Sequence, residues 1–582
     1  MTLKDLIVFL LYIAGNVGVS VYLGKKIKNS DDFFAAGRQS SWWLSGLSAF
    51  MTMFSAGTFV VWGGIAFKAG FVAVTISMCL GVSALFVGYF LAGRWRRLGV
   101  SSAAEFISLR YGKWALNFYT WFNILYRLLG MAVALYSLAV VLQAILPENM
   151  DAFFLNHIGI SAVNTIIIFC GIIIVAYAIF GGLWSVLITD VLQFIILMVA
   201  VIVVIPLGFM KLGGISKFTQ QVPDGFFNPV NHEFTWIFMA AWVVIHMFKI
   251  GGEWAFVQRF ICVPKTSDAR KATYLFGLLY FISPVIWFLP PMMYRIIDPS
   301  ANAEQAYVLA CKYILPDGLL GLMVAAMFAA TVSMIDSELN VFAGVLTKDF
   351  YKRIWKKASE KSQVFVGRAL TLFLGAMVVW LAILVPVMGG AEDIILSITS
   401  LIAGLTVLPV IWGMFSRKIT QKGIFAAILI TGTTFFLIKY GLLSANGWFI
   451  SETPGALQTW ILTNVRTIEA VCGAVVPFIV LAIIELSLKN KDSHFLEINQ
   501  HAEEEAEKEM ESSLFPAKIM AFAIAILATI IAVLAATAGM DSGSEWTISA
   551  TLFIISGIIW LLVKRMEKQR QIKKLNSINT KT

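Results

Sequence analysis

The chain has 582 residues, of which 59% are hydrophobic and only 13% are charged. Soluble domains have about 45–50% apolar and about 25% charged residues, so this composition excludes a soluble enzyme. The net charge of +10 could indicate a nucleic-acid partner, but its basic residues lie in loops between apolar runs, so we expect a lipid bilayer and no nucleic acid as partner.

Hydropathy predicts an all-α polytopic membrane protein with about 15 transmembrane helices, because about 20 apolar residues span a bilayer as a helix. The predicted segments are 6–24, 43–67, 70–93, 114–146, 162–180, 184–211, 234–260, 271–297, 317–350, 366–388, 390–416, 422–443, 466–488, 517–538 and 545–564. Nucleotide-binding and phosphate-cradling motifs are missing from the sequence, so we do not expect transport driven by ATP hydrolysis.

The loops between these segments alternate in charge. Alternate loops are rich in Lys and Arg, as in Lys25–Lys28, Arg94–Arg97, Lys352–Lys357 and Lys564–Lys574, whereas the intervening loops carry Asp and Glu. Basic loops face the cytoplasm in membrane proteins. The pattern therefore predicts a cell membrane protein with its N-terminus outside and its C-terminus in the cytoplasm.

The second predicted span has small and hydroxyl residues in its middle, including Ser55, Gly57, Thr58 and Gly63–Gly64. Glycine weakens a helix and lets the backbone approach a ligand. A helix broken at the bilayer midplane exposes carbonyl oxygens that can coordinate Na⁺. The alternative interpretation is close helix packing at small residues.

Ionisable residues occur in two further spans. Asp190 lies near one end of the sixth span, where it is either a functional group or one that reaches the membrane interface. In the seventh span His246, Lys249 and Glu253 share one helix face, and Gly251–Gly252 is a plausible unwinding point. These residues indicate either a solute site with a fixed positive charge or a self-neutralising pair held in the bundle.

The ninth span carries a polar face. Ser333, Asp336, Ser337 and Asn340 follow each other at the spacing i, i+3, i+4 and i+7, which places them on one side of a helix. Hydroxyl residues in this arrangement can form an interhelical hydrogen-bond seam. Because a carboxylate joins them, the face also suits an ion site.

At these residues the chain resembles the sodium/solute symporter family, which includes sodium/glucose and sialic-acid transporters. The matching motifs extend from about Leu6 to about Leu488, and their order and spacing carry the resemblance. They are Arg97-Leu98-Gly99-Val100, Glu105-Phe106, Arg110-Tyr111-Gly112, Gly181-Gly182-Leu183-Trp184-Ser185-Val186, Thr189-Asp190, Gln193, Gln258-Arg259, Phe328-Ala329-Ala330, Ser333, Asp336-Ser337, Asn340, Thr347-Lys348-Asp349, Gly413-Met414-Phe415 and Lys422-Gly423.

The resemblance implies an inverted five-plus-five helix repeat of the leucine-transporter type with extra peripheral helices. The expected divisions are an N-terminal extra helix and cytoplasmic loop (1–42), a transporter core (43–416) with repeat one at 43–211 and repeat two at 234–416, peripheral helices (417–488), a charged cytoplasmic linker (489–515), two additional helices (516–566) and a basic cytoplasmic tail (567–582).

The resemblance also implies one sodium site. Its ligands would be the carbonyls of Met51, Phe54 and Ala330 and the hydroxyl of Ser333, with Asp190 matching a family aspartate linked to sodium handling. Met334 departs from the family pattern, which commonly has a second Ser or Thr there. A soft thioether is a poor ligand for a hard cation, so the site loses an oxygen unless another group supplies one.

The solute would bind near the midplane, between the broken helices. The positions expected to face it are Thr58, His246, Lys249, Glu253, Tyr280, Ser397 and Ser400. The leading expectation is Na⁺-coupled symport of a small organic solute, with a sugar or a sugar-derived acid favoured, by alternating access. Na⁺ is then the coupling ion, and we expect no other cofactor and no enzyme activity. The alternatives are the same fold coupled to a proton or to no cation, and a non-transporting membrane solute sensor.

Overall fold

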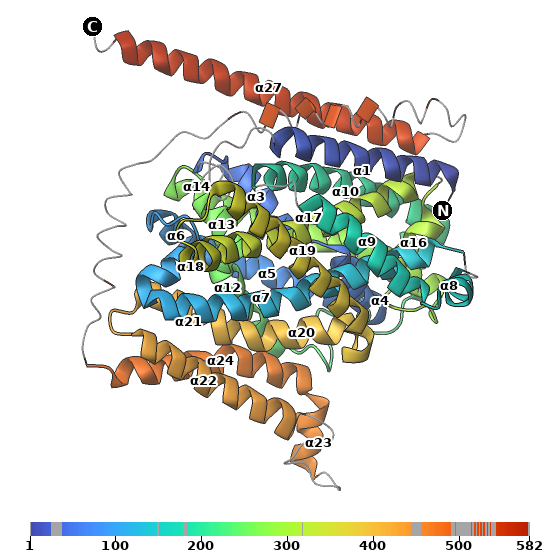
Figure 1. Cartoon of the computed structure of the whole chain (residues 1–582). Helices are drawn as coiled ribbons and strands as arrows, with labels where there is room; N and C mark the ends of the chain where they lie inside the picture. Colours follow the sequence, from blue (N-terminus) through green and yellow to red (C-terminus); the bar gives the residue numbers. More distant parts are fainter. Residues whose placement is uncertain are drawn as a thin grey trace.

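The computed structural model describes residues 2–24, 38–147, 150–178, 183–316, 318–443, 455–489 and 543–579, and isolated residues between 495 and 536. In these residues the chain folds into a bundle of helices (Figure 1). Helices α1 and α27 lie along one side of the bundle, and α22, α23 and α24 lie along the opposite side (Figure 1). The predicted linker 489–515 lies almost wholly outside the described residues.

The elements follow the apolar runs of the sequence. The first half of the chain forms α1 (Leu3–Gly24), α3 (Trp42–Met51), η2 (Thr58–Trp62), α4 (Gly63–Ala69), α5 (Val72–Val87), η3 (Gly88–Ala92), α6 (Gly93–Arg97), α7 (Ala103–Ile145), α8 (Met150–Ile158), α9 (Ala162–Ala178), α10 (Leu183–Leu212), α11 (Ile215–Gln221), α12 (Trp236–Gly252), α13 (Trp254–Ile261), α14 (Thr266–Trp287) and α15 (Leu289–Ile297). The second half forms α16 (Ala306–Ile314), α17 (Leu319–Val345), η4 (Leu346–Tyr351), α18 (Lys352–Ile354), α19 (Glu360–Leu384), η5 (Val385–Met388), α20 (Gly390–Ile402), η6 (Ala403–Val407), α21 (Leu408–Phe415), α22 (Gln421–Leu437), η7 (Ile438–Leu442), α23 (Ala456–Thr463), α24 (Val465–Ser487) and α27 (Gly543–Asn579).

The described helices confirm an all-α membrane protein. Ten of them are long and apolar enough to cross a membrane, or up to 12 when each of two bent pairs counts as one span. The sequence predicts about 15 spans. Three of the segments behind that number do not enter the count. Segment 6–24 forms α1, which is not among the counted helices, 43–67 is split into short pieces, and most of 517–538 lies outside the described residues.

Two spans are broken in the middle. Helix α3 ends at Met51, and the helix resumes only at Ala56, so residues 52–55 are non-helical. Helices α12 and α13 meet at Glu253, whose extended backbone (φ −69°, ψ 136°) bends the pair by 57°. A Cβ atom on the preceding Gly252 would lie 2.6 Å from Val407, so glycine permits a close approach to η6 at this break.

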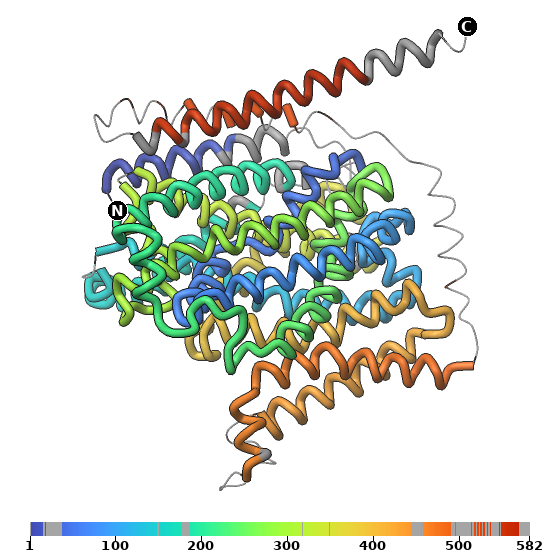
Figure 2. Tube along the Cα trace, turned by 180° about the vertical axis from the view of Figure 1, so that it is seen from behind, coloured from blue at the N-terminus to red at the C-terminus, as the bar shows by residue number. Residues whose placement is uncertain are grey.

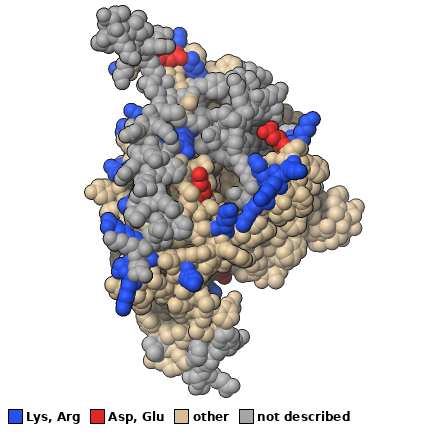
Figure 3. Space-filling model, turned by 60° about the vertical axis from the view of Figure 1, so that its left-hand side comes forward, with Lys and Arg blue, Asp and Glu red and all other residues tan. Residues whose placement is uncertain are grey.

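One end of the bundle is rich in basic side chains. Helices α6 and α18 and the start of α14 lie at one end, and α4, α8 and α16 lie at the other (Figure 1). Lys and Arg side chains gather over the first of these, here called the basic end (Figure 3). Helix α1 starts at the opposite end and α27 runs toward the basic end (Figure 1, Figure 2). The start of α1 and the end of α27 therefore lie at opposite ends of the bundle.

The first turn of α1 is tied to the start of α17. The carboxylate of Asp5 is 1% exposed, and its Oδ1 accepts hydrogen bonds from the backbone N–H groups of Gly318 (2.7 Å) and Gly321 (2.9 Å). The first N–H groups of a helix have no partner within the helix, and a negative charge there is favourable. Asp5 therefore caps α17, the helix that carries Ser333, from another part of the chain.

Replacing Asp5 with alanine should lower the stability of the fold by about 1–2 kcal/mol, because two buried N–H groups of α17 lose their acceptor. The thermal unfolding midpoint of the purified protein in detergent measures this loss. Lys4→Ala is the matched control, since Lys4 is exposed in the same turn. Equal midpoints for the two variants would contradict the capping role.

Candidate functional site

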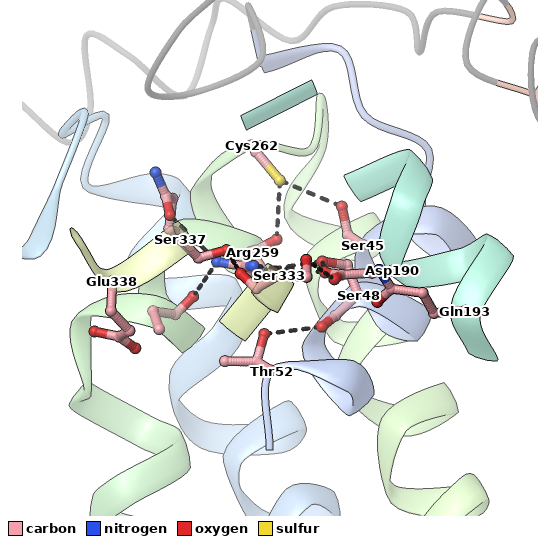
Figure 4. A network of polar contacts seen from close by, with 12 residues as sticks. Ser45, Ser48, Thr52, Asp190, Gln193, Arg259, Cys262, Ser333, Ser337 and Glu338 are labelled. Atoms are coloured by element: carbon pink, nitrogen blue, oxygen red, sulfur yellow. Dashed lines mark hydrogen bonds and ion pairs between the residues drawn. The ribbon is translucent and has the colours of Figure 1, made fainter. Parts of the chain in front are cut away.

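Asp190 joins three helices at the centre of the bundle. Its Oδ2 accepts a hydrogen bond from Ser48 of α3 (2.6 Å), and its Oδ1 accepts one from Ser333 of α17 (2.8 Å). Asp190 itself belongs to α10 and is 4% exposed. Figure 4 shows these side chains directed toward one another. Ser333, on the polar face predicted for the ninth span, and Ser48 of the second span thus both donate to the same carboxylate.

A buried arginine neutralises Asp190. Nη2 of Arg259, on α13, lies 3.7 Å from Asp190 Oδ2. Nε of the same guanidinium donates to the Ser48 hydroxyl at 3.3 Å, and Nη1 donates to the carbonyl of Ala255 at 3.2 Å. Because a charge buried at this depth is costly unless it is paired, the guanidinium of Arg259 compensates the carboxylate of Asp190 (Figure 4).

The break in the second span lies against α17. The backbone N–H of Ala56, directly after the break, donates to the Thr331 hydroxyl at 2.8 Å. On the other side of α17, Gln193 donates to the carbonyl of Ala329 at 3.2 Å. The hydrogen bonds of Ala56 and Ser333 therefore bring the elements that carry Met51 and Phe54 together with those that carry Ala330, Ser333 and Asp190.

Some of the oxygen atoms at this junction already take part in hydrogen bonds. The Met51 carbonyl accepts the N–H of Phe54 at 2.8 Å, and Thr52 donates its hydroxyl to the Ser48 carbonyl at 2.8 Å. The Ser333 hydroxyl gives its proton to Asp190, which leaves lone pairs on its oxygen. A carbonyl also has two lone pairs, so Met51 can still offer one to a cation.

Asp336 is a second buried carboxylate on the polar face of α17. It is 2% exposed, and its Oδ1 accepts a hydrogen bond from Asn340 at 2.6 Å. Ser337 donates its hydroxyl to the Ser333 carbonyl at 2.8 Å. The four residues predicted to share this face are therefore linked in pairs along the helix.

A cavity of about 130 Å³ opens beside this junction. Among the residues predicted to face the solute, Thr58, His246, Lys249 and Tyr280 line it. Thr52 and Met334 line it as well, so the cavity borders the junction of the second and ninth spans. Several aromatic side chains line its walls, among them Phe50, Phe54, Trp62, Tyr126, Trp242, Trp287 and Phe288.

His246 and Lys249 differ in their surroundings. Nδ1 of His246 hydrogen-bonds to the Trp242 carbonyl at 3.0 Å, and the ring lies 4.5 Å from the Trp242 ring. A carbonyl only accepts, so Nδ1 carries the proton and Nε2 is an acceptor in the neutral ring. Lys249 has no hydrogen bond or ion pair with the described residues. Lys249 thus brings to the cavity an ammonium group that no carboxylate among the described residues contacts directly.

Three other predicted solute positions lie elsewhere. Glu253 forms an ion pair with Arg127 and does not line the cavity. Ser397 donates to Glu469 at 3.1 Å and accepts from Lys439 at 3.0 Å. The backbone of Ser400 packs against α24, where a Cβ on Gly473 would lie 1.7 Å from the Ser400 carbonyl oxygen.

The sequence analysis missed a charged residue of the cavity wall. Arg127 of α7 lines the cavity, as does Thr399 of α20. Arg127 is an ionisable residue within an otherwise apolar run, and such residues indicate functional sites in membrane proteins. The rule that singled out Lys249 therefore also applies to Arg127. Thr399 lies in the same polar stretch as the predicted Ser397 and Ser400, and it is the hydroxyl residue of this stretch that lines the cavity.

Comparisons with known proteins agree with this geometry. The family model described as "Sodium:solute symporter family" matches residues 33–432. A sodium/glucose cotransporter of Vibrio parahaemolyticus is 25% identical over 484 residues, which cover 76% of this chain and 86% of that protein. The sodium/sialic acid symporter NanT of Aliivibrio fischeri is 26% identical over 384 residues, covering 63% of this chain and 73% of that protein.

Solved structures give the fold. A Na⁺-coupled sialic acid symporter in a substrate-bound, outward-open state superposes with a TM-score of 0.68 and 21% sequence identity. The match covers 84% of this chain and 99% of that structure. The chain therefore has the fold of the leucine-transporter type, as the resemblance implied.

Proposed function

Because the chain belongs to the sodium:solute symporter family, a family of transporters and not enzymes, we propose that it carries a small organic solute across the cell membrane together with Na⁺. The observation that supports this most directly is the hydrogen bond between Ala56 and Thr331 beside the buried Asp190. It places a broken helix, a polar helix face and a cavity at one point inside an apolar bundle.

The coupling Na⁺ would bind where the second span breaks. Its ligands would be the carbonyl oxygens of Met51, Phe54 and Ala330 and the hydroxyl of Ser333. Asp190 would act from close by through Ser333, since Arg259 already compensates its charge. The two breaks, in α3–α4 and α12–α13, occur early in segments 43–211 and 234–416, which supports their assignment as the two inverted repeats.

The solute would bind in the adjoining cavity. Aromatic walls suit the apolar face of a sugar ring, and the Lys249 ammonium suits a carboxylate. The related proteins named above transport glucose and sialic acid by their names. A sugar-derived acid matches both features of this cavity, so it is the favoured solute.

The basic end would face the cytoplasm, because basic loops are retained on that side of a membrane. The start of α1 then lies outside and the end of α27 lies inside (Figure 1). Na⁺ entering from outside gains about 2.3 kcal/mol per 100 mV of membrane potential, which provides the work for uptake.

Replacing Lys249 with alanine should abolish uptake of a carboxylate solute, because the cavity then lacks the ammonium group that pairs with the carboxylate. Uptake of radiolabelled sugar acids into proteoliposomes measures the effect. Lys68→Ala is the matched control. Lys68 is 57% exposed in its ion pair with Glu392, and it lies on α4, at the end of the bundle opposite the basic end. Unchanged uptake in Lys249→Ala would remove Lys249 from the site.

The solute can be identified by a thermal-shift screen of the purified protein against sugars, sugar acids and amino acids, in Na⁺ and in K⁺. A ligand that binds the native state raises its apparent stability by mass action. A sugar acid that stabilises the protein in Na⁺ and not in K⁺ is the expected result. A screen in which Na⁺ makes no difference would overturn sodium coupling.

Met334 favours one second candidate, the same transport cycle driven by a proton. Its thioether replaces an oxygen at the sodium site, which weakens the binding of a hard cation. Solute counterflow in proteoliposomes with and without Na⁺ distinguishes the two candidates. Counterflow that is equal in both media would favour the proton.

A further inference from the structure

Arg127 joins three elements at one end of the cavity. One guanidinium nitrogen pairs with Glu253, at the break between α12 and α13, and another pairs with Glu338 of α17. Glu253 is 4% exposed and Glu338 is 5% exposed. We call these three residues the floor triad. Glu338 lies to one side of the network around Asp190 (Figure 4), so the triad is separate from the candidate sodium site.

The direction of each helix places the triad between the cavity and the basic end. Helix α12 lines the cavity with Lys249 and reaches Glu253 one turn later, after which α13 continues toward the basic end. Helix α17 lines the cavity with Met334 and reaches Glu338 one turn later, on its way to α18. Helix α7 starts at the basic end and comes to the cavity at Arg127.

The charges of the triad do not balance. Two carboxylates share one guanidinium, and Oε2 of Glu253 is buried without a hydrogen-bond partner among the described residues. An unsatisfied buried oxygen of this kind costs free energy. Because breaking the triad frees Glu253 to find a better partner, the closed arrangement is held less firmly than a fully satisfied ion pair.

Lys249 is the group best placed to transmit the binding of a solute in the cavity to the floor triad. It lies four residues before Glu253, and the two opposite charges interact across the break between α12 and α13. When the cavity is empty, the ammonium group is available to Glu253. When a carboxylate occupies the cavity, the ammonium group pairs with that ligand, and Glu253 depends on Arg127 alone.

From these contacts we propose that the floor triad is the inner gate of the transporter, which seals the cavity from the basic end and must separate for solute release. The three residues lie on three different helical elements, so their ion pairs hold together parts that move relative to one another when the cavity opens inward. This inference rests on the proposed transport function only for the direction of release. The seal itself can be measured without Na⁺ or solute.

The test uses a reporter cysteine in the cavity wall. Thr399→Cys places a thiol among the lining residues, and a membrane-impermeant maleimide is applied to inverted vesicles and to whole cells. The protein without Thr399→Cys gives the background from the native cysteines, four of which are buried. Labelling is followed with and without the gate variants.

Arg127→Gln should raise the labelling rate of the reporter from the basic side about tenfold, because both ion pairs are lost and the open form gains population. Glu338→Gln should raise it less, since Arg127 keeps Glu253. Lys68→Gln, which breaks an exposed pair with Glu392 at the other end, should leave it unchanged. Each variant is first checked for a monodisperse elution profile.

Labelling from the basic side that is the same in Arg127→Gln, Glu338→Gln and the parent would overturn the gate. If Arg127→Gln does not fold, the labelling rate of Glu338→Gln tests the gate by itself. This variant keeps the ion pair of Arg127 with Glu253, so it disturbs the fold less. A faster labelling rate in the gate variants would support the gate. If the protein also showed no Na⁺-dependent uptake of any solute, the proposed function would be contradicted while the gate would stand.

Discussion

Replacing Asp190 with alanine should lower the stability of the folded protein by about 3–5 kcal/mol, because removing one partner of a buried pair leaves the other charge uncompensated. Arg259 is 2% exposed, and its guanidinium loses the carboxylate that lies 3.7 Å away. Ser48 and Ser333 lose their acceptor at the same time. The thermal unfolding midpoint in detergent measures this loss of stability. We expect Na⁺-driven uptake in proteoliposomes to be lost as well.

A double variant separates the loss of stability from the loss of transport. Asp190→Ala combined with Arg259→Met removes both charges and keeps an apolar chain in place of the guanidinium. Replacing a buried pair by apolar groups is often neutral for stability, so the midpoint should return toward that of the parent. Uptake should remain lost, because Ser333 no longer has the carboxylate that orients its hydroxyl. A stable Asp190→Ala single variant would contradict the charge compensation described here.

The fold could be predicted largely from composition and spacing. Apolar runs of about 20 residues have few stable conformations in a bilayer, so the predicted segments 184–211 and 466–488 coincide with α10 and α24. The breaks were indicated by glycine. Gly251–Gly252 precede the observed break at Glu253, and Gly57 follows the break that ends at Ser55.

The candidate site could be predicted only in part, because a sequence pattern defines one helix face at a time. The spacing of Ser333 and Asp336 indicates a polar face but says nothing of which helix it meets. The pairing of Asp190 with Arg259 depends on how α10 and α13 pack, and that is a property of the whole bundle. The resemblance to a known family linked Asp190 to sodium handling but did not predict its pairing with Arg259.

Charge pairs across helices were the least predictable feature. The i, i+4 spacing suggested that Lys249 would neutralise Glu253, yet Glu253 pairs with Arg127, which lies 126 positions away. The break at Glu253 interrupts the regular helix, so the spacing argument fails at that residue. Ser397 likewise serves a cross-helix pair between Lys439 and Glu469 rather than the cavity.

Replacing Met334 with serine should tighten the binding of Na⁺ about tenfold, or by about 1.4 kcal/mol. Met334 borders the cavity next to Ser333, so a hydroxyl at this position adds an oxygen beside the carbonyl of Ala330. Oxygen is the ligand type that hard cations prefer, whereas a thioether contributes little. The Na⁺ concentration that gives half the maximal thermal shift measures the change.

Two further variants show whether the gain comes from the oxygen. Met334→Leu keeps the apolar volume and adds no ligand, so its Na⁺ dependence should equal that of the parent. Ser333→Ala removes the hydroxyl that Asp190 orients, so Na⁺ binding should weaken even when Met334→Ser is present. If Met334→Ser leaves Na⁺ binding unchanged, the cation does not bind between the break at residues 52–55 and α17. Coupling through a proton would then explain why a methionine is tolerated at this position.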